Sequence, residues 1–348
     1  MIVVFGGYGV FGSHAARYLA TSGLPVRIAG RDAARAESFA ASLGEGHEGI
    51  AADVGDPASC ARALQGARVA VSCAGPFSTM KTALPEACLT SGIHYVDIAD
   101  DRGWTARLRA RDGWFRDHGL TAAVGCSSLP GISGALALRA AERLPAVERA
   151  RITLFIGNRN PKGEAAVRSA RAQLGRPFPA PQGTLRGFHG GETVVLPPPF
   201  GRRRVYDWDS PELDLFPDLL GVRSVRVKVG FEARLATLSF AGLARLGPRL
   251  GGLLLAGVAP MARYFSGFGH SGGFVKVELF APDGTVAAAS IGGASDAQRM
   301  AALPAAFVAQ SLHDGSITTR GVVTAYEALD ASCLIERLTA EGYELRGD

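Results

Sequence analysis

The sequence lacks an apolar run long enough to cross a membrane. Its most apolar stretch, residues 250–265, is shorter than the roughly 20 residues that a spanning helix needs, and it contains Pro260. We therefore expect no stable membrane insertion, and the stretch is either a buried, groove-lining helix or a peripheral membrane contact. No basic segment precedes the apolar residues that begin at Ile2, so no signal peptide is expected.

Other classes of protein are also disfavoured. The five cysteines form no CxxC pair and the histidines are widely spread, so we expect no disulfide scaffold, no metal site and a cytoplasmic location. The net charge of +5 comes almost wholly from arginine, with no long basic block. This charge fits an anionic small ligand, and we expect no nucleic-acid partner.

Short apolar strands alternate with longer helical patterns over the first 125 residues. Strands with little polar alternation, separated by helices, are typical of a parallel sheet that is covered on both faces. The sequence therefore predicts a doubly wound α/β domain of the Rossmann type. The predicted strands span residues 2–5, 26–29, 49–52, 68–72, 94–98 and 120–124.

A GxGxxG motif formed by Gly7, Gly9 and Gly12 follows the first predicted strand and begins a helix. In a dinucleotide-binding turn, the first glycine makes the bend, the second admits the pyrophosphate and the third lets helix and strand pack closely. The N–H groups at the start of the helix then face the phosphates. This context favours dinucleotide binding over a purely structural turn.

The second predicted strand ends in AGRD, where an NAD site usually has an acidic residue. Arg31 can bind a 2′-phosphate bidentately, which favours NADP over NAD. Asp32 is either that acid or the N-cap of the next helix. Asp53, after the third strand, is placed to meet the adenine edge or is an ordinary loop residue.

The fourth strand ends in SCAGPF, beside the point where ligands bind in open α/β sheets. Gly75 and Pro76 either let the backbone pass close to the nicotinamide or form a simple turn. The predicted cofactor-binding residues are Gly7, Tyr8, Gly9, Val10, Phe11, Gly12, Arg31, Asp32, Asp53, Val54, Ala74, Gly75 and Pro76.

The pattern changes after Gly131. Residues 222–229 and 274–280 alternate apolar with charged side chains, which is typical of an antiparallel sheet with one wet face. We predict a Rossmann domain at 1–128 and an α+β domain at 129–317, built on a largely antiparallel sheet for substrate binding or dimerisation. The helical pattern over 318–348 is expected to return to the Rossmann domain.

Five motifs in this order resemble the saccharopine dehydrogenase-like family of NADP-binding oxidoreductases. They are GGYGVFG, AGRD, CAGPF, ACLTSGIHYVDIADD and GCSSLPGISG, within about the first 135 residues. The resemblance implies a Rossmann domain, a second domain that closes over the substrate, and a homodimer. More distant relatives resemble trans-acting enoyl reductases. The chain departs from the family pattern at Ala99 and Asp100, where glycine and glutamate are common, and at Lys81, where glycine is common.

Hydride transfer also needs a group that exchanges a proton. Lys81, Asp97 and Asp100 are the candidates, although Asp97 fits a structural role equally well and Lys81 can instead lie along a helix face. His94 is expected to be a scaffold residue. The predicted substrate-binding residues are Phe77, Cys126, Ser127 and Ser128.

The sequence thus predicts an NADP-dependent oxidoreductase that acts on an unidentified and rather hydrophobic small molecule in an interdomain cleft. The apolar residues 250–265 and the abundance of Leu, Val and Phe in the second domain favour such a substrate. The alternative is a sensor or scaffold protein that binds NADP without turnover. Substrate identity and the direction of the reaction are not encoded in any motif.

Overall fold

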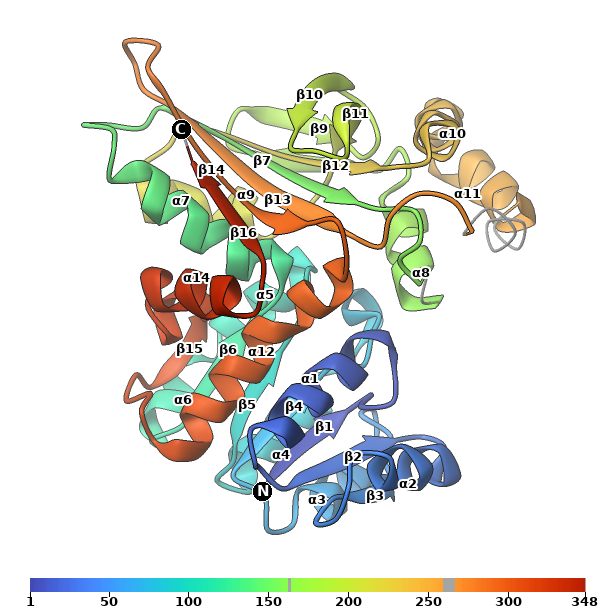
Figure 1. Cartoon of the computed structure of the whole chain (residues 1–348), viewed down its shortest axis with the longest axis vertical. Helices are drawn as coiled ribbons and strands as arrows, with labels where there is room; N and C mark the ends of the chain where they lie inside the picture. Colours follow the sequence, from blue (N-terminus) through green and yellow to red (C-terminus); the bar gives the residue numbers. More distant parts are fainter. Residues whose placement is uncertain (162–163, 259–266, 348) are drawn as a thin grey trace. The chain divides into compact units, whose positions relative to one another are not determined.

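The computed structural model describes residues 1–161, 164–258 and 267–347. The chain divides into two compact units, and each is discontinuous in sequence. The first comprises Met1–Ile132 and Gln298–Arg337, and the second comprises Ser133–Ala297 and Leu338–Asp348. Figure 1 labels their helices and strands.

A seven-stranded sheet forms the centre of the first unit, in the order β15-β6-β5-β4-β1-β2-β3. All of its pairings are parallel. Strands β1 to β6 have the order of the Rossmann fold, and β15 is added beside β6. The predicted fold class is confirmed. The strands are β1 (Ile2–Phe5), β2 (Val26–Gly30), β3 (Glu48–Ala51), β4 (Val69–Ser72), β5 (His94–Asp97), β6 (Thr121–Val124) and β15 (Gly321–Thr324).

Aspartates at the strand-to-helix turns fix the starts of three helices in this unit. Asp32, Asp56 and Asp101 each accept a hydrogen bond from a backbone N–H in the first helical turn. A short loop separates the end of each strand from the cap that follows it, and these loops lie at one edge of the sheet. The helical elements are α1 (Val10–Thr21), α2 (Ala33–Ala41), α3 (Pro57–Leu64), η1 (Phe77–Thr79), α4 (Ala83–Thr90), α5 (Arg102–Arg109), α6 (Asp112–Asp117) and η2 (Ser128–Ile132).

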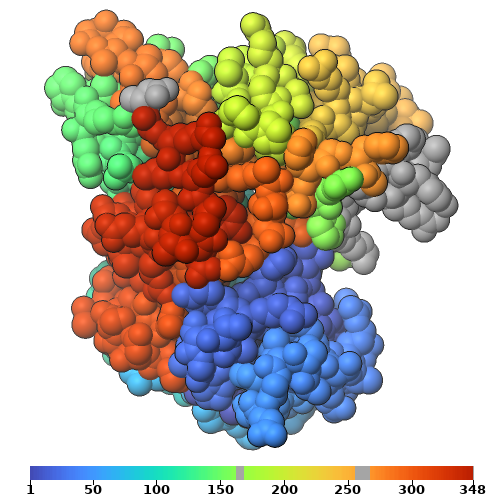
Figure 2. Space-filling model, viewed as in Figure 1, coloured from blue at the N-terminus to red at the C-terminus, as the bar shows by residue number. Residues whose placement is uncertain are grey.

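The chain returns to the first unit through α12 (Ala297–Asp314), β15, α13 (Ala325–Ala328) and α14 (Ala331–Ala340). The Tyr18 ring meets Phe307 edge-on at 5.1 Å, and the amino group of Met1 lies 3.1 Å from Nε2 of His313. In Figure 2 the orange-red residues of this return lie against blue N-terminal residues. The guanidinium of Arg337 lies over the Phe307 ring, at 4.2 Å from its centroid.

The domain boundaries differ from the predicted ones. The first segment runs to Ile132 rather than 128, and the return begins at Gln298 rather than 318, because α12 is part of the first unit's core. The last residues belong to the second unit, since β16 (Glu344–Gly347) pairs with β14 (Val286–Gly293).

A mixed seven-stranded sheet forms the second unit, in the order β10-β11-β12-β7-β13-β14-β16. Five of its pairings are antiparallel, and β12 pairs with β7 in parallel. The largely antiparallel sheet is therefore confirmed. Its other elements are α7 (Ser133–Ala141), β7 (Arg149–Ile156), α8 (Glu164–Gln173), β8 (Pro177–Ala180), β9 (Gly183–Arg186), β10 (Glu192–Leu196), β11 (Gly201–Asp207), α9 (Glu212–Leu220), β12 (Ser224–Phe231), α10 (Arg234–Arg245), α11 (Gly247–Val258) and β13 (Gly273–Phe280).

The charged face of β12 is less exposed to solvent than the alternation of apolar and charged residues predicts. Lys228 is buried and its Nζ lies 2.7 Å from a carboxylate oxygen of Asp207, which is buried as well. Lys228 also donates a hydrogen bond to the carbonyl of Gly190. The chain around Gly190 covers this end of the face, and a buried charge is retained there because it is paired.

Residues 250–265 fall only partly on α11, because residues 259–266 lie outside the described part of the chain. Within the described residues, no helix combines the length and apolarity that a membrane crossing requires.

Candidate cofactor-binding site

Six loops of the first unit meet at one edge of its sheet, because the carboxyl ends of parallel strands lie together. Nearly all the predicted site residues are on these loops. They follow β1 (Gly6–Gly9), β2 (Arg31, Asp32), β3 (Asp53, Val54), β4 (Ala74, Gly75, Pro76, Phe77), β5 (Asp100) and β6 (Cys126, Ser127, Ser128), with Asp97 the last residue of β5.

The glycines after β1 are required by close backbone packing. A Cβ on Gly12 would lie 2.2 Å from the carbonyl oxygen of Gly6, and one on Gly7 would lie 2.8 Å from that of Val4. Gly6 has φ +72° and packs against the backbone of the loop after β4, where a Cβ would be 3.0 Å from the Ala74 nitrogen. The glycine turn and the CAGPF loop are therefore in contact.

Helix α1 begins at this turn with its positive end open. Gly9 is the N-cap and has no side chain to cap the first N–H groups, and the first turn contains no acidic residue. These N–H groups and the helix dipole attract an anion. The geometry fits the pyrophosphate of a dinucleotide.

The loop after β2 is joined to the glycine turn by Tyr8. The ring of Tyr8 covers Gly30, where a Cβ would lie 2.3 Å from the ring, and its hydroxyl accepts a hydrogen bond from the Asp32 N–H at 3.1 Å. Asp32 caps α2 through the Arg35 N–H at 3.1 Å, as one of its two predicted roles requires. Its other carboxylate oxygen has no role in this cap.

Two arginines follow β2, and one of them lies over Tyr8. Arg31 is exposed, and the guanidinium of Arg35 lies over the Tyr8 ring at 4.6 Å from its centroid. Sequence reasoning missed Arg35, although its position one helical turn after Arg31 was a usable signal. Two cations at the end of β2 suit a phosphate in this position.

Asp53 holds the loop after β3 in a tight turn. Its Oδ1 accepts the Gly55 N–H at 2.8 Å, and its own N–H donates to the Ser59 hydroxyl at 3.1 Å. The side chain is exposed and the neighbouring Val54 is half-buried. The placement leaves both residues accessible at the sheet edge.

Asp97 is buried and ties two of the loops together. Its Oδ1 accepts the N–H groups of Ala99 at 3.0 Å and Gly125 at 2.8 Å, and its Oδ2 accepts Trp104 Nε1–H at 2.6 Å. Burial raises the pKa of the Asp97 carboxyl, and these hydrogen bonds oppose the rise. Every one of these contacts is to the scaffold, as the structural interpretation of Asp97 requires.

Asp100 differs from Asp97 because it is exposed at the edge of the sheet. The protein crowded around it nevertheless raises the pKa of its carboxyl to about 6, and the neighbouring Asp101 adds to the rise. A group that titrates near neutrality can both give and take a proton, as acid–base chemistry requires.

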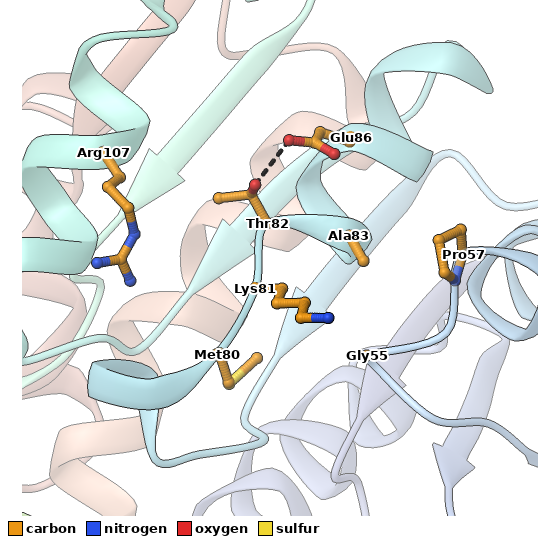
Figure 3. Close-up of a pocket in the computed structure, with 8 residues that line it drawn as sticks. All are labelled: Gly55, Pro57, Met80, Lys81, Thr82, Ala83, Glu86 and Arg107. Atoms are coloured by element: carbon orange, nitrogen blue, oxygen red, sulfur yellow. Dashed lines mark hydrogen bonds between the residues drawn. The ribbon is translucent and has the colours of Figure 1, made fainter.

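Lys81 lines a cavity of about 480 Å³ (Figure 3). The lining comes from segments that follow β3, β4 and β5, including Gly55, Met80 and Arg107. Figure 3 shows the Lys81 side chain extending toward the Gly55–Pro57 segment, while the hydroxyl of Thr82 donates to Glu86 at 2.6 Å. Lys81 is exposed and shares this lining with Gly55 and Pro57 of the loop that follows β3.

The predicted substrate-binding residues are buried. Burial raises the pKa of the Cys126 thiol well above its usual range, and Asp97 adds to the effect, so Cys126 is not a thiolate nucleophile. Ser127 and Ser128 follow it in the loop after β6. Phe77 packs against Trp104 with ring centroids 5.5 Å apart.

His94 behaves as a scaffold residue. Its Nδ1 accepts the Thr121 N–H at 3.0 Å, which joins β5 to β6. Burial, with Arg320 and Arg68 nearby, lowers the pKa of His94 to about 4, so the ring is neutral.

The second unit contains a polar cluster that sequence reasoning missed. Nδ1 of His270 lies 2.7 Å from Oε1 of Glu232, whose Oε2 accepts the N–H groups of Asn158 at 2.9 Å and His270 at 2.7 Å. Burial alone would raise the pKa of Glu232, but these hydrogen bonds lower it. The two residues are 38 positions apart, so no local motif indicates the pair. Among the described residues, no group of His, Cys, Asp and Glu side chains is arranged to hold a metal.

Residues 2–122 match a family model described as the saccharopine dehydrogenase NADP binding domain. Among solved structures, the chain is similar to saccharopine dehydrogenase (L-Glu forming) from Saccharomyces cerevisiae, with a TM-score of 0.70 and 13% identity over 100% of this chain and 99% of that one. This likeness shows the fold.

Matches to smaller dehydrogenases are partial. A short chain dehydrogenase/reductase family protein has a TM-score of 0.30 and 22% identity, over 36% of this chain and 72% of its own. Serine dehydrogenase from Escherichia coli has a TM-score of 0.31 and 16% identity, over 36% of this chain and 81% of its own. No curated protein sequence matches the chain.

Proposed function

We propose that the protein is an NADP-dependent oxidoreductase. Two findings support this: residues 2–122 match the model of the saccharopine dehydrogenase NADP binding domain, and the fold is similar to that of saccharopine dehydrogenase. The observation that carries the proposal is the glycine turn after β1. It is packed too closely for any other residue at Gly12, and it presents the uncapped start of α1 to a ligand. Val10 and Phe11 contribute the first turn of this helix.

We propose NADP rather than NAD because cations dominate the end of β2. Arg31 and Arg35 bind the 2′-phosphate, Tyr8 positions Arg35, and Asp32 is partly engaged as a helix cap. Asp53 and Val54 border the adenine, while Ala74, Gly75 and Pro76 pass beside the nicotinamide. Lys81, next to Gly55, adds positive charge on the adenine side.

We propose Asp100 as the residue that exchanges a proton with the substrate. NADPH supplies a hydride to one atom of a polarised double bond, and the other atom then takes a proton. A carboxyl with a pKa of about 6 on the loop after β5 can supply it. The buried Asp97 holds that loop in place through the N–H of Ala99. Phe77, Cys126, Ser127 and Ser128 line the substrate side.

The substrate is proposed to be a rather hydrophobic small molecule bound between the two domains. The apolar composition of the second domain supports this class. We also propose a cytoplasmic homodimer, on the resemblance of the chain to its family and on its unpaired cysteines. Light scattering of the purified protein tests the dimer.

The experiment compares Asp100→Asn with Asp101→Asn in a screen of NADPH oxidation by carbonyl, imine and enoyl compounds. Asp101 is a matched control because asparagine still caps α5. We expect Asp100→Asn to lower turnover by about 10²–10⁴-fold without weakening NADPH binding. Turnover of the wild type should fall as the pH rises through about 6, because Asp100 then loses its proton.

Equal turnover in the two variants would remove Asp100 from the chemistry. Tight NADPH binding without turnover of any compound would instead favour the sensor or scaffold alternative. Failure of both variants and the wild type to bind NADPH would refute the proposed function itself.

A further inference from the structure

Helices α10 and α11 form a hairpin in the second unit (Figure 1). Several of its apolar side chains are exposed. All the exposed leucines of the described chain are in this hairpin, with exposed fractions from 44% to 81%. They lie at helical spacing, so each helix presents one leucine stripe. The residues are Leu235, Leu238, Leu246, Leu250, Leu253 and Leu254, which we call the leucine face.

The hairpin is packed against its own unit through small residues and one aromatic ring. Phe240 stacks on Phe188 at 4.9 Å. Gly251 crosses α10 so closely that a Cβ would lie 2.2 Å from the carbonyl oxygen of Leu243, and Thr237, Ala241 and Ala244 are buried. These residues form the described part of the inner face, while the six leucines of the leucine face are exposed. An exposed apolar surface of this kind marks an interaction site.

The charged residues within the hairpin segment itself have one sign. From Ala233 to Val277 the sequence contains no aspartate or glutamate. Arg234, Arg245 and Arg249 are exposed on the hairpin, and no described residue forms an ion pair with any of them. Leucines flanked by unpaired arginines are the composition of a helix that lies in an anionic membrane interface.

A second copy of the chain fits this face poorly. A twofold interface would place the same acid-free surface against itself, and arginines would meet arginines with no carboxylate between them. Anionic lipid headgroups instead supply the missing negative charge while the acyl chains accept the leucines. We propose that the leucine face docks on the surface of an anionic phospholipid bilayer, independently of the oxidoreductase activity.

The experiment measures co-sedimentation of the full-length protein with vesicles of phosphatidylcholine, with and without phosphatidylglycerol. We expect binding to the anionic vesicles that weakens as salt is added. Leu238→Ser combined with Leu253→Ser should lower it by at least about tenfold, because two apolar anchors are removed. Val286→Ser is the matched control, since Val286 is exposed at the far end of β13–β14 and its change should have no effect.

A second variant tests the proposal even if the leucine variant fails to fold. Arg245→Gln with Arg249→Gln leaves every leucine in place and should also weaken binding to the anionic vesicles. Thermal unfolding and NADPH affinity should match the wild type in both. The proposal is overturned if folded wild type does not bind anionic vesicles or if the leucine variant binds equally well. It is also overturned if light scattering shows a dimer that the leucine substitutions dissociate, because a second copy then covers the face.

Discussion

Gly12→Ala is the substitution for which the structure makes the sharpest prediction. Alanine is favoured over glycine in a helix by about 1 kcal/mol, so α1 itself would gain from the change. The new Cβ, however, would lie 2.2 Å from the Gly6 carbonyl oxygen and 2.8 Å from the Gly7 Cα. The glycine turn and α1 must then separate by about 1 Å to reach ordinary contact distances.

Overpacking of this kind costs about 1–3 kcal/mol, which outweighs the gain in helix propensity. The shift also moves the N–H groups of α1 away from the phosphates, and loss of one hydrogen bond to a charged group costs about 1.5–3 kcal/mol. We therefore expect Gly12→Ala to lower the thermal stability and to weaken NADPH binding by about 10–100-fold.

Gly113→Ala is the control, because Gly113 is exposed in α6 and a Cβ there meets no atom within 4 Å. It should leave NADPH binding unchanged and the stability equal or slightly higher. Calorimetry and titration of NADPH fluorescence measure the two effects. The reasoning is refuted if Gly12→Ala unfolds at the wild-type temperature and binds NADPH as tightly as the control.

Two further predictions concern buried carboxylates. Asp97→Asn should destabilise the protein by about 1–3 kcal/mol, because the NH2 group of asparagine would face an N–H that now donates a hydrogen bond to the carboxylate. An unchanged unfolding temperature would contradict this. Burial alone would raise the pKa of Glu278, but Arg151 and Lys276 lower it by more than burial raises it. The pKa of Glu278 in the folded protein is therefore below that in the unfolded chain. Its stabilisation is therefore present above pH about 4.5 and is lost as the pH falls through the folded pKa. Glu278→Gln should lower the free energy of unfolding at pH 7 by about 1–3 kcal/mol, and the difference from the wild type should shrink as the pH falls through the folded pKa; a constant difference would contradict the assignment.

The first unit could be predicted from sequence because its signals are local. Each apolar strand is followed by a turn residue and a helix, and the carboxyl ends of parallel strands coincide by topology. Gly7, Gly9 and Gly12 follow β1, and Arg31 follows β2 at the same edge of the sheet.

What sequence could not predict depends on distant contacts. The alternation of residues 222–229 places Lys228 on the side of the strand expected to face solvent. In the structure, the chain around Gly190 and Asp207 covers it. The Glu232–His270 pair joins residues from two different segments. The raised pKa of Asp100 arises from the protein packed around it rather than from its motif. The leucine face has no sequence signature distinct from a buried helix, because periodicity does not say which stripe faces solvent.

Titration of the wild type and of Arg31→Ala with NADPH and NADH tests the central claim most directly. The wild type should bind NADPH at least about tenfold more tightly than NADH, and Arg31→Ala should remove most of that preference while leaving NADH binding unchanged. Asp32→Asn, which retains the helix cap, should keep the preference. Equal affinity of the wild type for the two nucleotides, or binding of neither, would contradict the account.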